Sequence, residues 1–300
     1  MITVPRTVLV VGSLHYDIMV EADHLPRRDE TAVGSRWYPK FGGKGGNQAV
    51  SARAHGASSR MIGAVGADDF GNFIRAHLGT SGVDDRFVTS LEDVASGMSV
   101  AIMDASGDYA ATIVSGANLH IAIETVLHPQ VWQNVGLLVL QNEVPESVNM
   151  AAAQEARNKG IRTLLNAAPS RPLSPEFGRL VDVLVVNAVE AEMMGAGPVT
   201  NLKAAATAAR KLADRFESVI VTAGALGLAA VTAGDEHFSF HAEKIKVVSS
   251  HGAGDAFIGA LAACLIGRMS FEDACRAASR AAADHVAGRP AAAIAVSSTE

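Results

Sequence analysis

Short apolar runs alternate along this chain with longer segments of helical periodicity. Runs rich in Val, Leu and Ile are typical of buried parallel strands, because helices cover both faces of such a sheet. The order of the elements therefore predicts an α/β fold built on a mostly parallel sheet. The expected strands are residues 7–11, 60–66, 137–140, 162–165, 183–186 and 218–221. The expected helices are residues 47–54, 69–78, 148–158 and 202–214, a buried helix from 256, and a pair of helices within 271–286.

Two stretches in the first part of the chain interrupt this pattern. Residues 14–20 alternate between apolar and polar positions, which predicts a strand with one solvated face on which His15 and Asp17 lie together. The segment that follows is polar, with candidate edge strands at 31–34 and 36–38.

A β-hairpin is predicted further on. Residues 97–104 and 109–114 flank Ala105-Ser106-Gly107-Asp108, a turn sequence between two apolar runs. We expect this hairpin and the earlier polar stretch to form one accessory sheet that serves as a lid. The expected organisation is a single α/β domain of residues 1–300, with the lid at about 14–41 and 97–115.

Polar and glycine residues directly follow several of the expected strands. Ligand crevices of open α/β sheets form at the carboxyl ends of the strands, so these residues are candidates for substrate binding. Glu143 and Glu190 are the acids among them, and an acid at that edge is more often functional than one elsewhere on the surface. For Asp17, a solvated loop acid is an equal alternative. The other candidates at this edge are Gln141, Asn142, Asn166, Asn187, Thr222, Gly224 and Gly227.

Four glycines surround a lysine in Gly42-Gly43-Lys44-Gly45-Gly46, just before the helix expected from Asn47. Glycine lets the backbone approach a ligand closely. Lys44 and Asn47 would donate hydrogen bonds to the hydroxyls of a polyhydroxylated ligand. The cluster is not a Walker A motif, because no Ser or Thr follows the lysine. A plain turn with a solvated lysine is the alternative.

The segment Gly252-Ala253-Gly254-Asp255 precedes the longest apolar run and predicts a tight turn that opens a buried helix. Free backbone N–H groups at a helix N-terminus bind anions, phosphate above all. A carboxylate placed at such an anion site indicates a chemical task. Asp255 would accept a proton from a hydroxyl that attacks a phosphoryl group. The segment therefore predicts a phosphoryl-transfer centre.

Composition excludes several classes of protein. The net charge is −6 and no run of Lys and Arg is present, which argues against a nucleic-acid partner. The longest apolar run, residues 256–267, is shorter than the roughly 18 residues of a membrane span, so no membrane partner is expected. Cys264 and Cys275 are expected to be core residues in a reducing compartment, and the protein is expected to be cytoplasmic.

Together these motifs resemble the ribokinase family of carbohydrate kinases, also called the PfkB family, over nearly the whole chain. The resemblance implies a three-layer sandwich with a small β-sheet lid. It also implies ATP-dependent phosphorylation of a hydroxyl of a small sugar, with ribose as the first candidate. The four segments that carry the resemblance are the glycine cluster 42–48, the acid-bearing segment 141–145, the N-x-x-E element 187–190 and the anion hole with its acid, 252–255.

The resemblance implies a role for individual residues. Asp255 would be the general base, and the turn of Gly252, Ala253 and Gly254 would form the anion hole. Glu190 would order Mg²⁺ through water. The sugar would contact His15, Asp17, Gly43, Lys44, Asn47 and Glu143, and the nucleotide would contact Asn187, Thr222, Gly224 and Gly227. In relatives the lid also pairs two subunits, which implies a homodimer.

The chain departs from the family pattern just before the anion hole. Ser249-Ser250-His251 stands where relatives usually carry Asp-Thr-Thr, and that Asp helps to form a monovalent-cation loop. Activation by K⁺ through Ser249 and His251 is therefore an open question. His15 stands where ribokinases often have Asn, so another pentose or a polyol-like sugar is a second candidate acceptor.

Two other functions remain compatible with the sequence. A nucleoside kinase of the adenosine, cytidine or pseudouridine type needs an apolar base pocket, and Tyr16, Trp37, Tyr38 and Met103 are candidates for it. Edge-strand packing or a dimer contact is the alternative role for these side chains. A non-catalytic sugar-binding protein would account for the altered cation loop, but not for the presence of Asp255.

Overall fold

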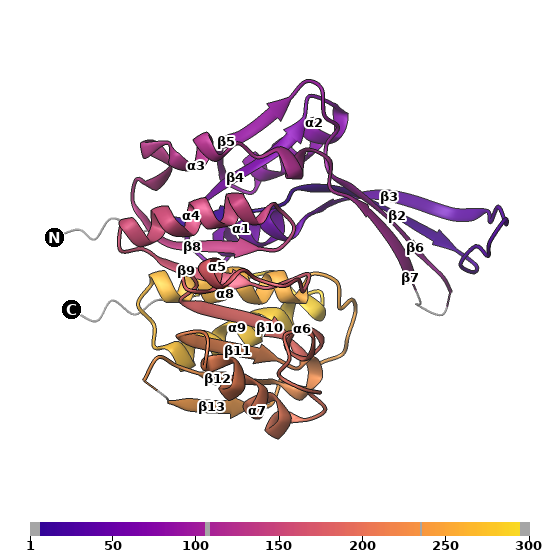
Figure 1. Cartoon of the computed structure of the whole chain (residues 1–300). Helices are drawn as coiled ribbons and strands as arrows, with labels where there is room; N and C mark the ends of the chain where they lie inside the picture. The colour runs from indigo at the N-terminus through magenta and orange to yellow at the C-terminus, as the bar shows by residue number, and fades with distance from the viewer. Residues whose placement is uncertain (1–6, 106–108, 235, 295–300) are drawn as a thin grey trace.

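A nine-stranded sheet forms the centre of the molecule (Figure 1). The structure is a computed structural model that describes residues 7–105, 109–234 and 236–294. The strand order is β13-β12-β11-β10-β9-β8-β1-β4-β5, and all pairs are parallel except at one edge, where β12 runs antiparallel to both β11 and β13. The strands are β1 (Thr7–Val11), β4 (Ser58–Gly66), β5 (Asp84–Leu91), β8 (Val135–Gln141), β9 (Arg162–Asn166), β10 (Val183–Asn187), β11 (Ser218–Thr222), β12 (Leu228–Val231) and β13 (His237–Phe240).

Helices cover both faces of this sheet, and an apolar core lies under each layer. The chain is therefore the three-layer α/β sandwich that was expected. One layer holds α1 (Lys44–Ala54), α2 (Asp69–Thr80), α8 (Ala253–Ile266) and α9 (Phe271–Val286). The other holds α3 (Ile123–Leu127), α4 (Glu146–Asn158), α5 (Pro175–Gly178), α6 (Ala188–Met193) and α7 (Leu202–Ala213). Short 3₁₀ turns are η1 (Gly116–His120), η2 (Pro129–Trp132) and η3 (Gly224–Leu226).

The order of the strands reverses between β1 and β8. From β1 the sheet grows through β4 and β5, whereas from β8 it grows the other way through β9, β10 and β11. Such a switch point leaves a crevice at the carboxyl ends of the two strands. No helix in the described part of the chain is long and apolar enough to cross a membrane.

A separate four-stranded sheet extends from the body as an arm (Figure 1). Its order is β3-β2-β6-β7, formed by β2 (His15–Ala22), β3 (Gly34–Gly42), β6 (Met98–Met103) and β7 (Tyr109–Val114). The turn expected at 106–108 lies outside the described residues. The edge strand expected at 31–34 is wrong, because strand pairing of β3 with β2 begins only at Gly34.

Two helices differ from the sequence prediction. Residues 271–286 form the single helix α9 rather than a pair, since no Gly or Pro interrupts the run and Ser270 caps its start through the backbone N–H of Asp273. Helix α1 begins at Lys44 rather than Asn47, so two glycines of the cluster lie inside its first turn.

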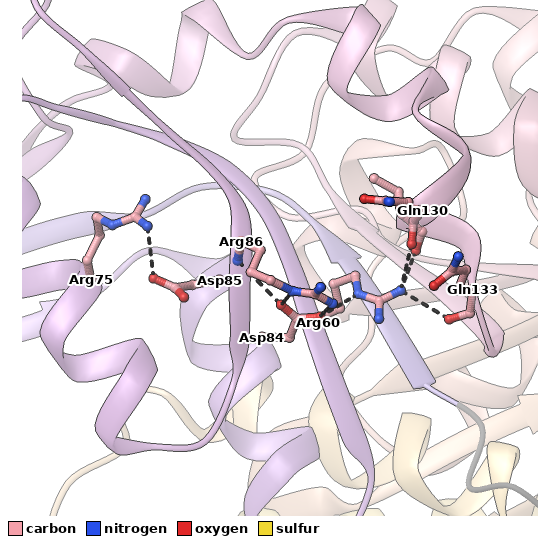
Figure 2. A network of polar contacts seen from close by, with 8 residues as sticks. Arg60, Arg75, Asp84, Asp85, Arg86, Gln130 and Gln133 are labelled. Carbon is pink, nitrogen blue, oxygen red and sulfur yellow. Dashed lines mark hydrogen bonds and ion pairs between the residues drawn. The ribbon is translucent and has the colours of Figure 1, made fainter.

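An arginine network ties the edge of the large sheet to the η2 segment (Figure 2). Arg60 on β4 is nearly buried, and its Nε donates to the carboxylate of Asp84 on β5 at 2.8 Å. Its Nη1 donates to the backbone carbonyls of Gln130, Val131 and Gln133 at 2.6–3.3 Å. The guanidinium charge is thus matched by one carboxylate and three carbonyls.

We expect Asp84→Asn to lower the free energy of unfolding by about 1–3 kcal/mol, because it leaves the Arg60 charge without an anion. Hydrogen bonds from Arg86 first, and from Arg60, hold the pKa of Asp84 well below its usual range. The unfolded chain therefore binds the proton more tightly, and the contribution of Asp84 is present above about pH 4 and lost below it. Urea unfolding between about pH 7 and pH 2 measures both effects.

The matched control is Asp85→Asn. Asp85 pairs with Arg75 at 3.3 Å, and both side chains are about a quarter to a third exposed. Such a pair contributes about 1 kcal/mol or less. The account is contradicted if the two variants lose the same free energy of unfolding. It is also contradicted if the stability of Asp84→Asn falls at acid pH as steeply as that of the wild type.

Candidate active site

The glycine cluster packs the start of α1 directly against the end of β1. A Cβ on Gly45 would lie 2.7 Å from the backbone of Gly12 and Ser13, and a Cβ on Gly46 would lie 2.6 Å from the ring of Phe41. Gly43 has φ +87, and a Cβ there would lie 2.7 Å from the Ser13 carbonyl. From the sequence, these glycines were expected to let a ligand approach the backbone, whereas contacts within the protein already require them.

Helices α1 and α8 lie equally close to each other. A Cβ on Gly259 would lie 2.4 Å from the side chain of Ser51, whose Oγ donates to the Ala256 carbonyl at 3.0 Å. This contact brings the first turn of α1 next to the first turn of α8. Asn47 and Gln48 are thereby placed beside Asp255, although some 200 residues separate them in the chain.

The carboxylate of Asp255 is buried and held by two amides. Asn47 Nδ2 donates to Oδ2 at 3.1 Å, and Gln48 Nε2 donates to Oδ1 at 2.9 Å. Gln48 is fixed in turn by Gln141 on β8, whose Nε2 donates to Gln48 Oε1 at 2.8 Å, and by Asn166 Oδ1 at 3.1 Å. Burial raises the pKa of Asp255, while the charge of Lys44 and these hydrogen bonds oppose the rise.

The turn ahead of Asp255 faces open space. Gly252 is the N-cap of α8 with φ +84, a left-handed conformation that favours glycine. Apart from the backbone of its own helix and its chain neighbours, no described residue has an atom within 4 Å of where a Cβ on Gly254 would stand. The backbone N–H of Ala253 makes only a 3.4 Å bond to the Ser250 carbonyl. Backbone donors at the start of α8 are therefore available to an anion.

His15 and Asp17 lie together on β2 of the small sheet, and both are buried. Ser99 Oγ donates to Asp17 Oδ1 at 2.5 Å, and a Cβ on Gly42 would collide with the Asp17 carboxylate. His15 Nε2 is buried, and no described residue gives it a hydrogen-bond partner. Both residues therefore lie in the protein interior, and the solvated-acid alternative for Asp17 is excluded.

Glu143 stands at the switch point and joins β8 to α1. Its Oε2 accepts a hydrogen bond from Ser13 Oγ and another, at 3.0 Å, from the backbone N–H of Lys44. Its charge acts on Asp255 and raises the pKa of that acid further. The carboxylate is thus fixed in place close to Asp255.

Three basic side chains approach this region from different elements. The positive charge of Lys44 acts to lower the pKa of Asp255, of Glu190 and of His251. Lys40 lies opposite Asp17 in the β2–β3 register, and burial lowers its pKa. Lys40 also acts on His251, so the small sheet and the loop before α8 face each other.

Asn187 and Glu190 form a capping box at the start of α6. Asn187 Oδ1 accepts from the backbone N–H of Glu190 at 2.9 Å, and Glu190 Oε2 accepts from the backbone N–H of Asn187 at 2.8 Å. Burial raises the pKa of Glu190. Only one carboxylate oxygen is used by the cap, which leaves Oε1 for another ligand. No group of three or more His, Cys, Asp or Glu side chains gathers as a metal site within the described ranges.

The remaining candidates follow β10 and β11. Thr222 pairs with Asn187 in the parallel register, so the two strand ends lie side by side. Gly224 has φ +55 with open space around it. Gly227 has φ +115, and a Cβ there would lie 2.0 Å from the Phe240 carbonyl.

Three residues of this region were not expected from the sequence to take part in the site. They are Ser13, Lys40 and Gln48. Gln141 and Asn166 were candidates for substrate binding because both follow expected strands, and the structure shows both hydrogen-bonded to Gln48. Lys40 carried no sequence signal, because a lysine in a polar segment is indistinguishable from a solvated one without the strand register.

A three-layer α/β sandwich with a small-sheet arm, and a glycine turn ahead of a buried acid, agree with the kinase class that the motifs predict, but a fold by itself does not fix a function. The model of the "pfkB family carbohydrate kinase" matches residues 5–294. The chain belongs to this family and is a carbohydrate kinase, a phosphotransferase.

Individual relatives agree with this assignment. The ribokinase of Haemophilus influenzae is 30% identical over 281 residues, covering 93% of this chain and 91% of the relative. The deoxyribokinase of Salmonella typhi is 30% identical over 285 residues, covering 94% and 93%. The structure of Arabidopsis thaliana ribokinase complexed with ribose and ATP superposes with a TM-score of 0.86 at 28% identity, covering 95% of this chain and 93% of that one.

Proposed function

We propose that the protein transfers the γ-phosphoryl group of ATP to a hydroxyl of ribose or a closely related pentose. The observation that carries the proposal is the buried carboxylate of Asp255, held by two amides directly behind an open helix N-terminus. The similarity to a ribokinase and to a ribose and ATP complex supports the substrates.

In this proposal Asp255 is the general base. Its two amide donors fix both carboxylate oxygens, so the oxygen that receives the hydroxyl proton has a set direction. Burial raises its pKa toward the working pH, which strengthens the ionised form as a base. The charge of Lys44 favours the ionised form, because it opposes the rise in the pKa that burial causes.

The turn 252–254 would receive the transferring phosphoryl group through backbone N–H groups. Asn187, Thr222, Gly224 and Gly227 would line the nucleotide at the ends of β10 and β11. Glu190 fits Mg²⁺ held through water, because one of its oxygens is left by the cap and Mg²⁺ is usually bound by few protein carboxylates. When bound, the ion would neutralise charge on the phosphate oxygens.

The acceptor would lie between the arm and the body. His15 and Asp17 approach from the small sheet, and Gly43, Lys44, Asn47 and Glu143 from the body. Closure of the small sheet as a lid would exclude water from the transfer. Pairing of two arms into a homodimer would cover the exposed Trp37 and Ile113 on that sheet.

An apolar nucleoside pocket is less well supported. The ring of Tyr16 stacks on Phe70 at 4.0 Å and meets Phe73 edge-on, so packing against α2 occupies it. Arg36 covers the ring of Tyr38 at 4.9 Å. These rings are therefore engaged within the protein.

A coupled assay of ADP release across a panel of acceptors tests the proposal. We expect ribose or 2-deoxyribose to give the highest kcat/KM, with kcat/KM for adenosine and cytidine at least about tenfold lower. A tenfold difference corresponds to about 1.4 kcal/mol of interaction with the acceptor. Chelation of Mg²⁺ by EDTA should stop turnover. If nucleosides alone are turned over, or if no sugar is phosphorylated while ATP binds, the proposal fails.

A further inference from the structure

The loop before the anion hole is tied to the end of α9 by three hydrogen bonds. His285 Nε2 lies 2.9 Å from the backbone carbonyl of His251. The backbone N–H groups of Val248 and Ser249 both donate to the Val286 carbonyl, at 2.8 and 3.2 Å. The last turn of α9 is therefore hydrogen-bonded to the segment immediately ahead of Gly252.

The direction of the His285 bond is fixed by chemistry. A carbonyl oxygen only accepts, so Nε2 of His285 must carry the proton. The same nitrogen would stand 3.0 Å from a Cβ on Gly252, the left-handed N-cap of α8. The imidazole thus lies beside Gly252 and fills the space that a side chain at this N-cap would need.

The oxygens of this loop do not fit a monovalent cation. Val286 O already accepts two bonds, His251 O accepts from His285, and Ser249 Oγ accepts from the backbone N–H of His251 at 3.3 Å. A carbonyl has two lone pairs, so Val286 O has none left. Ser249 also offers a neutral hydroxyl in place of an acid.

The charges around the loop disfavour a cation as well. The positive charges of Lys40 and Lys44 act to lower the pKa of His251, and the negative charge of Asp17 acts to raise it. Bringing another positive charge among them costs Coulomb energy. The same basic groups suit the anion hole that begins one residue later.

We propose that His285 is a positioning residue that holds the anion-hole turn by a hydrogen bond in place of a monovalent cation, so that turnover is independent of K⁺. Its imidazole touches neither substrate nor the transferred group, and it acts through the His251 carbonyl on the backbone N–H groups of 253–254. The inference rests on the proposed kinase activity.

The test compares three variants of the full chain. His285→Ala removes the donor, and we expect kcat to fall about two- to tenfold, the effect of one hydrogen bond. KM for the sugar should stay within about twofold, because the acceptor side is untouched. His285→Gln keeps a side-chain N–H donor and should recover most of the loss. His120→Ala, an exposed histidine on η1, is the matched control and should match the wild type.

Dependence on K⁺ is measured by replacing choline chloride with KCl at constant ionic strength. Wild-type kcat and melting temperature are expected to be the same in both salts. Activation of the wild type by K⁺ would overturn the proposal, as would wild-type kcat in His285→Ala or equal losses in His285→Ala and His285→Gln. If the wild type turns over no acceptor, the kinase function itself is refuted. That result is distinct from an active enzyme whose kcat does not change in His285→Ala, which refutes only the role of His285.

Discussion

Replacing Asp255 by Asn is expected to lower kcat by about 10²–10⁴-fold, the range attributed to a positioned general base. The amide still accepts the hydrogen bond from Gln48, and Asn47 can turn its own amide to meet the new donor. The acceptor and nucleotide sites are therefore preserved. Turnover measured by ADP release, with ribose binding followed by calorimetry, separates chemistry from binding.

Thermal stability should be maintained or increased in Asp255→Asn. Because burial raises the pKa of Asp255, the ionised acid is less favourable in the folded chain at neutral pH than in the unfolded chain. Removing it removes that cost, as is common when a functional acid is replaced.

The matched control is Asp273→Asn. Asp273 is the third residue of α9, as Asp255 is of α8, but it is exposed and bonded to its own N-cap Ser270 at 2.6 Å. We expect this variant to keep wild-type kcat. An active Asp255→Asn, or an equally impaired Asp273→Asn, would disprove the assignment of the base.

Adding a single methyl group at Gly45 is expected to lower the free energy of unfolding by about 1–3 kcal/mol, the usual cost of overpacking. The new Cβ would lie 2.7 Å from the backbone of Gly12 and Ser13, where no flexible side chain can move aside. Helix α1 must shift, and Asn47 and Gln48 shift with it. Gly45→Ala should therefore also lose activity, as measured by urea unfolding and ADP release on the same preparation.

Gly79→Ala is the control for this variant. Gly79 lies in α2 with nothing within 4 Å of the added Cβ, so the substitution should be neutral or stabilise by up to about 1 kcal/mol. A harmless Gly45→Ala would show that the glycines are not needed for packing. In that case, close approach of a ligand to the backbone would remain as the explanation for the glycine cluster.

The sheet and most helices could be predicted because their residues carry a local signal. Strands β1, β8, β10 and β11 each contain an apolar run of three or more residues, and α2 and α7 have clear periodicity. Strands β5, β12 and β13 were missed, and in β5 the reason is that Asp84, Asp85 and Arg86 at its start read as a loop. Those charges belong to the arginine network, which only the fold assembles.

The positions of the candidate site residues could be anticipated more readily than their contacts. Asp255 was singled out from the turn that precedes it, but its hydrogen bonds from Asn47 and Gln48 depend on the approach of α1 to α8. The bond from Gln141 to Gln48 likewise depends on the approach of α1 to β8. That approach depends on Gly259 and Gly45, whose sequence signal is the same as that of a loop glycine. Pairings between residues some 200 positions apart are set by tertiary packing, not by local pattern.

The small sheet carries His15, Asp17 and Lys40, while Asp255 and its amide partners belong to the body. Under the proposed function, this division places part of the acceptor contacts on a different sheet from the base, while Gly43, Lys44, Asn47 and Glu143 would contact the acceptor from the body. A laboratory library confined to β2 and β3 would then vary the small sheet's share of these contacts and leave Asp255 and its amide partners unaltered.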